Sequence, residues 1–110
     1  MRLFFLALPL ISPVIAGAES LALTAYAKSP VGKILFLRHA LAPGNGDPAH
    51  FSFDNCLSQR NLDAVGRQQA SKIGALFREH GIVFERIYSS QWCRCRETAK
   101  LLDIGPVFDL

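Results

Sequence analysis

Apolar residues along the chain gather into short runs and helical stripes that alternate with polar loops. Residues 34–37 form a continuous apolar run, which suits a strand buried on both faces, as in a parallel sheet. Further strands are expected at 86–89 and, after a Gly-Pro break, from residue 107. Right-handed crossovers would make these strands parallel, so the pattern predicts an α/β fold.

Two helices are expected between the strands. Apolar residues recur at helical spacing over 63–80, where Asp63 suits the N-cap and Gly81 suits the position just past the end. The second helix is expected to start from an N-cap at Ser90 and to run to about Leu102, with a core face that includes its tryptophan.

A loop of about twenty residues, 41–61, follows the first expected strand and is rich in Gly, Pro and Asn. Its position favours the wall of an active site. Phe51 and Phe53 are expected to pack the loop onto the domain. His50 is interpreted as a solvated loop residue, and His80 as a residue that complements the dipole of the first helix.

Residues 1–18 are typical of a secretory signal peptide. Arg2 provides the charged start, an apolar stretch follows, and Ala16-Gly17-Ala18 fits a cleavage site. A membrane anchor is the alternative, but the stretch is shorter than the roughly 20 residues that a spanning helix needs. We therefore expect a periplasmic or secreted protein without a stable membrane anchor after cleavage, in which 19–32 is a lead-in segment.

Composition narrows the function classes. The chain has 110 residues, with 12 Lys and Arg against 9 Asp and Glu, which gives a formal net charge of +3. This length allows one small domain. No long basic run or basic–aromatic alternation is present, so nucleic acid is not an expected partner. No metal site is expected either, because Cys93 and Cys95 have the wrong spacing for zinc.

Arg38 and His39 directly follow the apolar run 34–37. Ligands of open α/β sheets bind beyond the carboxyl ends of the strands, so this dipeptide occupies the place of a reactive site. A neutral imidazole is a nucleophile when one ring nitrogen is held by a hydrogen bond and the other is free. A guanidinium matches phosphate oxygens, and Asn45 could donate to a further oxygen. The alternative is that Arg38 and His39 only end a strand.

The segment Leu37-Arg38-His39 resembles the signature of the histidine phosphatase superfamily, which is also called phosphoglycerate-mutase-like. Ala40 stands where that family usually has Gly. Residues 62–70 and 87–99 are similar to two further family segments, and the resemblance covers about 33–102. It implies a three-layer sandwich around a parallel sheet, of which this chain would hold the N-terminal portion.

The resemblance also implies roles for individual residues. His39 would accept the phosphoryl group as a covalent intermediate, while Arg38, Asn45 and Arg94 would bind the phosphoryl oxygens. Arg94 lies four residues after Ser90, as the family motif requires; the rival, Arg96, has the wrong offset. The implied activity is hydrolysis of a small phosphomonoester without a cofactor. A phosphomutase and a non-catalytic phosphate- or phosphosugar-binding module are the alternatives.

The family's pocket also needs a second histidine and an acidic proton donor from later elements. The histidine cannot be placed in this sequence, since none follows Arg94. The acid cannot be placed either, because Glu97 and Asp103 lie on or after the second expected helix and not in a later loop. We therefore expect residues 33–110 to be the N-terminal part of a truncated domain that is inactive alone. The identity of the substrate and the oligomeric state are not predicted.

The three cysteines allow one disulfide bond in an exported chain. Cys93 and Cys95 are two residues apart, so on a helix they point to different sides and should not pair. The pattern favours a bond between Cys56 in the loop and Cys93, with Cys95 as a buried thiol. Three free thiols are the alternative.

Overall fold

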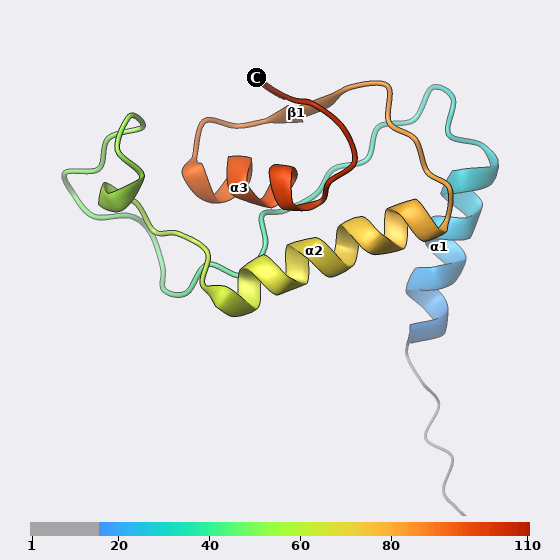
Figure 1. The fold of residues 1–110 in the computed structure, drawn as a ribbon, viewed down its shortest axis with the longest axis horizontal. Helices are drawn as coiled ribbons and strands as arrows, with labels where there is room; N and C mark the ends of the chain where they lie inside the picture. Colours follow the sequence, from blue (N-terminus) through green and yellow to red (C-terminus); the bar gives the residue numbers. More distant parts are fainter. Residues whose placement is uncertain (1–15) are drawn as a thin grey trace, which may run out of the picture.

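The computed structural model describes residues 16–110 of the chain. Its elements, in chain order, are α1 (Ala16–Lys28), the 3₁₀ helix η1 (Cys56–Ser58), α2 (Ala64–Glu79), β1 (Ile87–Ser89), α3 (Cys93–Leu101) and β2 (Val107–Asp109) (Figure 1). The two strands are parallel, with Ile87 opposite Val107 and Ser89 opposite Asp109. The helix α3 connects them, so the described residues form a small α/β fold, as the sequence predicts.

The helix α2 begins and ends where the sequence predicts. The Asp63 side chain accepts a hydrogen bond from the backbone N–H of Gly66 at 2.7 Å, which caps the start. Gly81 follows the end with φ +65°, a conformation that suits glycine. The buried face of the helix includes Ala70 and Phe77.

The start of α3 differs from the prediction. Trp92, not Ser90, is the N-cap residue, and it makes no side-chain capping bond. The backbone N–H of Cys93 instead donates to Oε1 of Gln59 at 2.9 Å. A side chain from 34 residues earlier therefore satisfies this first-turn donor, which removes the need for a local cap.

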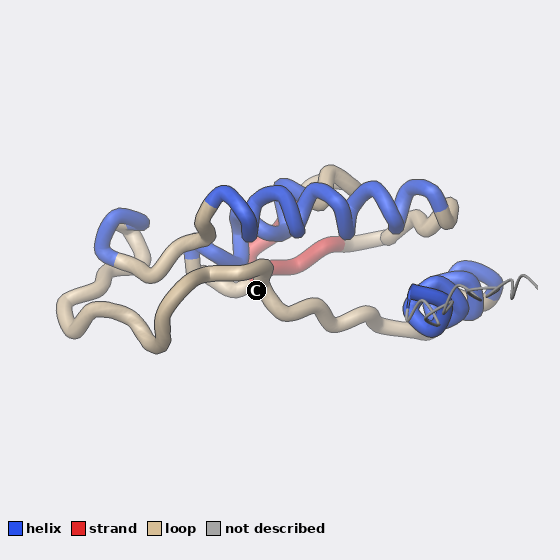
Figure 2. The backbone as a smooth tube through the Cα atoms, turned by 90° about the horizontal axis from the view of Figure 1, so that it is seen from below, coloured by secondary structure: helices blue, strands red, loops and turns tan. Residues whose placement is uncertain are grey.

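The prediction of a buried strand at 34–37 is wrong for this structure. The segment is extended but is not paired with any described residue, and Ile34 and Phe36 are 77% and 90% exposed. In Figure 2, α2 lies on one side of the strands and the extended segment that leaves α1 runs on the other. A strand forms only with a hydrogen-bonded neighbour, and the described sheet consists of β1 and β2 alone.

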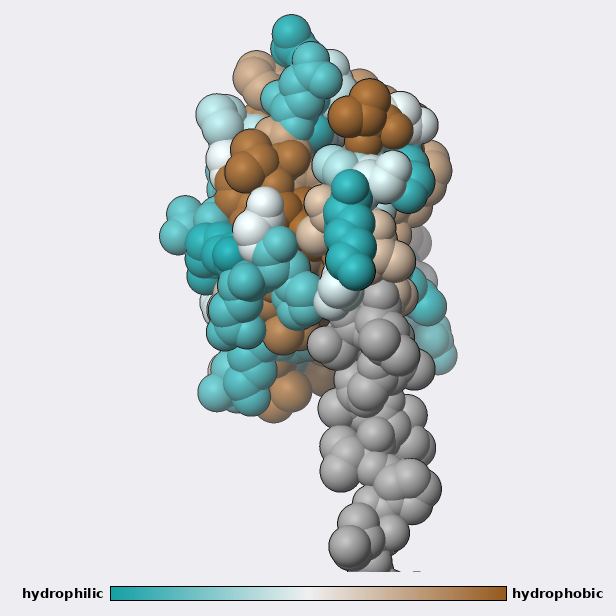
Figure 3. Space-filling model, turned by 90° about the vertical axis from the view of Figure 1, so that its right-hand side faces the viewer, coloured by the Kyte–Doolittle hydropathy of each residue, from teal (hydrophilic) through white to brown (hydrophobic). Residues whose placement is uncertain are grey.

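Two small apolar clusters hold the elements together. One contains Ala40, Ala42, Leu62 and Ala70, and joins the segment after His39 to α2. The other joins α2 to the segments that follow α2 and α3, through Phe77, Ile82 and Leu102. Apolar surface also remains open to solvent, as the face in Figure 3 shows.

The first part of the proposed signal peptide, residues 1–15, lies outside the described residues. Its expected cleavage site, Ala16-Gly17-Ala18, falls at the start of α1, and this helix covers most of the lead-in 19–32. Tyr26 of α1 packs against the second apolar cluster. Among the described residues, no helix combines the length and apolarity that a membrane crossing requires.

Candidate active site

His39 lies half-buried at the wall of a cavity of about 470 Å³. Its Nδ1 is 2.7 Å from the carbonyl oxygen of Ala40. Because a carbonyl oxygen can only accept, Nδ1 carries the proton in this arrangement, and the Nε2 lone pair is left for another partner. This is the tautomer that a nucleophilic histidine requires.

The backbone after His39 is fixed to both long helices of the α/β unit. The N–H of Ala40 donates to the Thr98 hydroxyl at 3.0 Å, and that hydroxyl donates to the Arg94 carbonyl at 2.7 Å. The N–H of Leu41 donates to Oε1 of Gln69 on α2 at 2.9 Å. The position of the imidazole is therefore set by α2 and α3 rather than by a strand.

Gly66 shows how closely α2 approaches this backbone. A Cβ atom at this residue would lie 2.0 Å from the carbonyl oxygen of Leu41, so only glycine fits without displacement of one of the two backbone segments.

The sequence alone assigns no function to Thr98. Its signal was its place one turn after Arg94 on a helix, from which a threonine hydroxyl can bond back to the preceding turn.

Arg94 is a buried cation, although the sequence placed it off the core stripe of its helix. The residue is 8% exposed, and its NH1 donates to Oδ1 of Asp47 at 2.9 Å and to the Arg60 carbonyl at 3.3 Å. Its guanidinium carbon lies 4.4 Å from the centre of the Trp92 ring, a cation–π distance. An acid that the sequence left unassigned therefore holds the proposed phosphate-binding arginine.

The charge of Asp47 is stabilised by its neighbours. Burial by itself raises the pKa of this carboxyl, but hydrogen bonds from the Arg60 backbone N–H and from Arg94, together with the charges of both arginines, outweigh that effect. The pKa of Asp47 consequently lies below the usual range of an aspartate.

Arg60 ties the loop that carries Asp47 to the rest of the site. Its backbone N–H donates to Oδ1 of Asp47 at 2.9 Å, its Nε donates to the Gly46 carbonyl at 2.8 Å, and its NH1 donates to the Ala42 carbonyl. These bonds hold residues 42–47 in one shape. No local pattern in the sequence indicates this role, because the bonds join residues 13 to 18 positions apart.

Arg38 and Asn45 are both exposed. Among the described residues, no hydrogen bond joins either of them to Arg94. The structure places Arg38 directly before His39 and Asn45 in the loop after it.

Arg96, the alternative to Arg94 for the phosphate-binding arginine, makes a bidentate ion pair with Asp109 of β2, with both N–O distances at 2.9 Å.

The other histidines lie away from His39. His50 is exposed in the loop, and His80 is the C-cap residue of α2, where its Nδ1 bonds the Leu76 carbonyl at 2.8 Å. Neither of them lines the cavity beside His39. Within residues 16–110, no group of three or more His, Cys, Asp or Glu side chains is placed to hold a metal ion.

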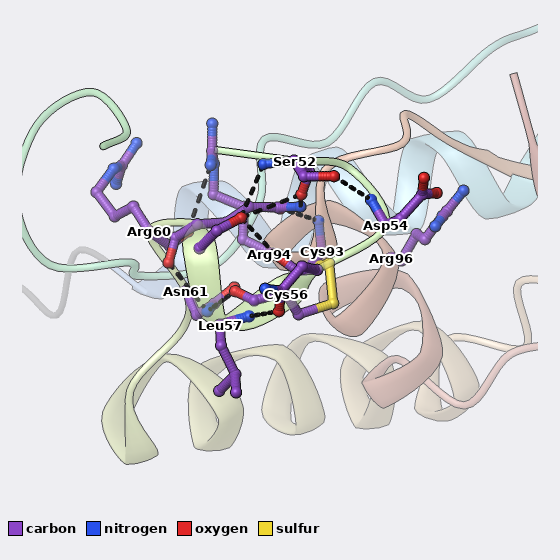
Figure 4. The surroundings of a disulfide bond; sticks show 12 residues. Ser52, Asp54, Cys56, Leu57, Arg60, Asn61, Cys93, Arg94 and Arg96 are labelled. Carbon is purple, nitrogen blue, oxygen red and sulfur yellow. Dashed lines mark hydrogen bonds between the residues drawn. A yellow bond between two sulfur atoms is a disulfide. The ribbon is translucent and has the colours of Figure 1, made fainter. Parts of the chain in front are cut away.

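A disulfide bond joins Cys56 to Cys93, the pair that the sequence favoured, with a Cα–Cα distance of 5.7 Å. Figure 4 shows this bond beside Arg94 and Arg60. Cys95 is a free thiol but is only half-buried, so the prediction that it is buried is wrong. Cys95 remains partly exposed because it lines the open cavity beside His39 instead of lying in a packed core.

The aromatic residues of the loop complete this side of the site. Phe51 and Phe53 pack against each other with ring centres 5.5 Å apart, and each contacts the Trp92 ring at 4.8 and 4.7 Å. The prediction that these phenylalanines pack the loop onto the domain is confirmed. Their cluster also covers the ring on which the Arg94 guanidinium lies.

Arg94 is thus a buried cation at the N-terminus of α3, and His39 lines a cavity with its Nδ1 bonded to a carbonyl oxygen; Arg94 itself does not line that cavity. In a comparison with known families, the model of the histidine phosphatase superfamily (branch 1) matches residues 34–106. The chain belongs to this superfamily, which comprises phosphatases and mutases. Searches of curated proteins and of solved structures found no match.

Proposed function

We propose that this site hydrolyses a small phosphomonoester through a phosphohistidine on His39. The observation that carries the proposal is the bond from His39 Nδ1–H to the Ala40 carbonyl, which leaves Nε2 as the nucleophile. The same peptide is anchored through Thr98 to the turn of α3 that bears Arg94. Nucleophile and phosphate-binding cation therefore share one rigid support.

The proposed reaction has two steps. In the first, Nε2 of His39 attacks phosphorus, the P–O bond to the leaving group breaks, and the leaving oxygen takes a proton from an acid. In the second, water attacks the phosphorus and gives up a proton, the bond between phosphorus and Nε2 breaks, inorganic phosphate leaves, and the neutral imidazole is restored. Arg38, Asn45 and Arg94 would hold the phosphoryl oxygens while negative charge builds on them.

The three-layer sandwich and the exported location belong to the same proposal. The β1–α3–β2 unit supplies parallel strands and a covering helix, which such a sandwich repeats. The signal-like segment 1–18 and the Cys56–Cys93 bond both suit an oxidising compartment, the periplasm or the exterior. We propose a small phosphorylated substrate, with no nucleic acid and no membrane anchor in the mature protein.

Trapping of the intermediate tests this function. The chain is incubated with a ³²P-labelled aryl phosphate and denatured, and the protein-bound label should be stable in base and lost in acid, as for phosphohistidine. His39→Ala should abolish labelling, whereas His50→Ala, which alters an exposed loop histidine, should leave it unchanged.

The outcome also separates the alternative functions. Transfer of the label to water supports a phosphatase, whereas transfer to the hydroxyl group of an added alcohol supports a mutase. Oxyanion binding that His39→Ala leaves intact, without any labelled protein, would show a binding module and contradict the proposal.

A further inference from the structure

Only part of the Arg94 guanidinium group has partners within the protein. NH1 carries two N–H groups and has two acceptors, Oδ1 of Asp47 and the carbonyl of Arg60. One face of the guanidinium plane lies over the Trp92 ring. The protein therefore takes up one corner and one face of this cation.

The opposite edge of the same group is unsatisfied. Nε of Arg94 is buried and has no hydrogen-bond partner among the described residues. A buried donor without a partner is costly, more so on a charged group, and such groups in native structures call for an explanation. An oxyanion that accepts from the Nε edge would supply the missing partner.

The Asp47 side chain is held in place by the protein, so it can fix the orientation of the Nε edge of the Arg94 guanidinium. Its side chain and that of Arg94 are each 9% exposed, and its Oδ1 accepts from both NH1 of Arg94 and the N–H of Arg60. Arg60 in turn bonds to the Gly46 carbonyl. The carboxylate cannot follow Arg94 if the guanidinium turns, so the pair has one preferred geometry.

We propose that Asp47 is a positioning residue, which holds NH1 of Arg94 so that the Nε edge is the one presented to the phosphoryl group. The inference rests on the proposed role of Arg94 in phosphate binding. Its energetic basis is preorganisation: an arginine fixed before the ligand arrives loses less rotamer freedom when it binds. Asp47 does not touch the phosphoryl group in this arrangement, since two anions would repel each other.

Binding of inorganic phosphate to the full chain tests the proposal. Titration calorimetry gives the Kd, and the fluorescence of Trp92, the only tryptophan, reports the ring beneath Arg94. Asp47→Glu keeps the charge but shifts the carboxylate, and Asp47→Ala removes it. Both should weaken phosphate binding about tenfold, the loss of roughly one hydrogen bond to a charged group. Asp47→Asn keeps an oxygen acceptor and should stay within about threefold of the wild-type Kd.

Two control variants separate positioning from stability and from net charge. Asp63→Ala removes the N-cap of α2, so it should lower the unfolding temperature and leave the Kd unchanged. Asp54→Asn removes an exposed carboxylate of the same loop and should also bind phosphate normally. Thermal unfolding of each variant shows that it is folded at the assay temperature.

The possible failures are distinguishable. Wild-type affinity in Asp47→Glu, with loss of binding in Arg94→Ala, would overturn the positioning role and leave the proposed function standing. Affinity in Asp47→Asn as weak as in Asp47→Ala would also overturn it, because charge rather than direction would then matter. Unchanged affinity in Arg94→Ala, or no saturable phosphate binding by the wild-type chain, would overturn both proposals.

Discussion

Arg94 and Arg96 are two residues apart on α3, yet the structure gives them different environments. Arg94 is buried against Asp47 and Trp92, whereas Arg96 pairs with Asp109 in a more exposed position. Only the first of them has a buried, unsatisfied donor, judged over the described residues. The difference predicts which arginine binds an oxyanion.

Arg94→Ala should therefore weaken vanadate binding by roughly tenfold to one-hundredfold, because a hydrogen bond to a charged group contributes about 1.5–3 kcal/mol. Arg96→Ala is the matched control and should bind vanadate like the wild type, since exposed ion pairs contribute little. The Kd values are compared at a temperature where both variants are folded. The reverse order of affinities would mean that the family motif has been assigned to the wrong arginine.

The lowered pKa of Asp47 predicts a pH dependence of stability. The unfolded chain, in which this pKa is higher, binds a proton more readily than the folded chain. The contribution of Asp47 is thus complete above the unfolded pKa, near 4 for an aspartate, and is lost as the pH falls through the folded pKa. Urea unfolding between about pH 6 and pH 3 should show a smaller loss of stability in Asp47→Asn than in the wild type. Equal losses in the two proteins would contradict the pKa shift.

At the residue scale, the sequence singles out His39 and Arg94 as candidates but not the residues that hold them. Asp47 lies 47 residues from Arg94, and Thr98 lies 58 residues from Ala40, so no local pattern indicates either contact. Asp47 can be explained locally as a solvated loop residue, and Thr98 as an ordinary residue of a helix. Their roles become visible only when the loop, α2 and α3 are brought together.

At the scale of elements, the predictions of α2 and of the strands β1 and β2 are confirmed, whereas the strand predicted at 34–37 and the predicted start of α3 are wrong. The start of α2 depends on Asp63 and its end on Gly81, and both signals are local. The segment 34–37 has the composition of a strand, but a strand also needs a neighbour, which composition does not specify. The start of α3 was misplaced for a similar reason, because Gln59 supplies an acceptor from a distant loop.

The Cys56–Cys93 bond links two such distant elements and makes a testable contribution to stability. It closes a separation of 37 residues, for which the loss of chain entropy in the unfolded state predicts about 3–4 kcal/mol. Reduction with dithiothreitol should lower the unfolding free energy of the wild type by about this amount. Cys95→Ser should respond to the reductant as the wild type does, because Cys95 is free.

The double variant Cys56→Ser, Cys93→Ser provides the complementary measurement. It should be as unstable as the reduced wild type and insensitive to dithiothreitol. Three titratable thiols in the unreduced, unfolded protein would show that the bond is absent from the protein in solution.

At the scale of the whole molecule, the lining of the cavity beside His39 determines which substrates could react under the proposed function. The cavity beside His39 is lined by largely apolar side chains from the 34–37 segment, β1 and α3, and no Asp or Glu of the described chain lines it. A general acid is needed when the leaving oxygen is strongly basic, as in an alkyl phosphate. The same acid is dispensable when the leaving group is already stable as an anion.

The substrate's leaving group should accordingly decide whether the 110-residue chain reacts. With an aryl phosphate such as p-nitrophenyl phosphate, we expect formation of the phosphohistidine on His39 and release of one equivalent of phenolate in a burst. With an alkyl phosphate such as glycerol phosphate, we expect binding without release of alcohol, because no Asp or Glu side chain of the described residues lines the cavity to protonate the leaving oxygen. Rapid-quench measurement of the burst with both substrates checks this, with His39→Ala as the blank. Sustained turnover of the alkyl phosphate that depends on His39 would show that these residues already contain a proton donor.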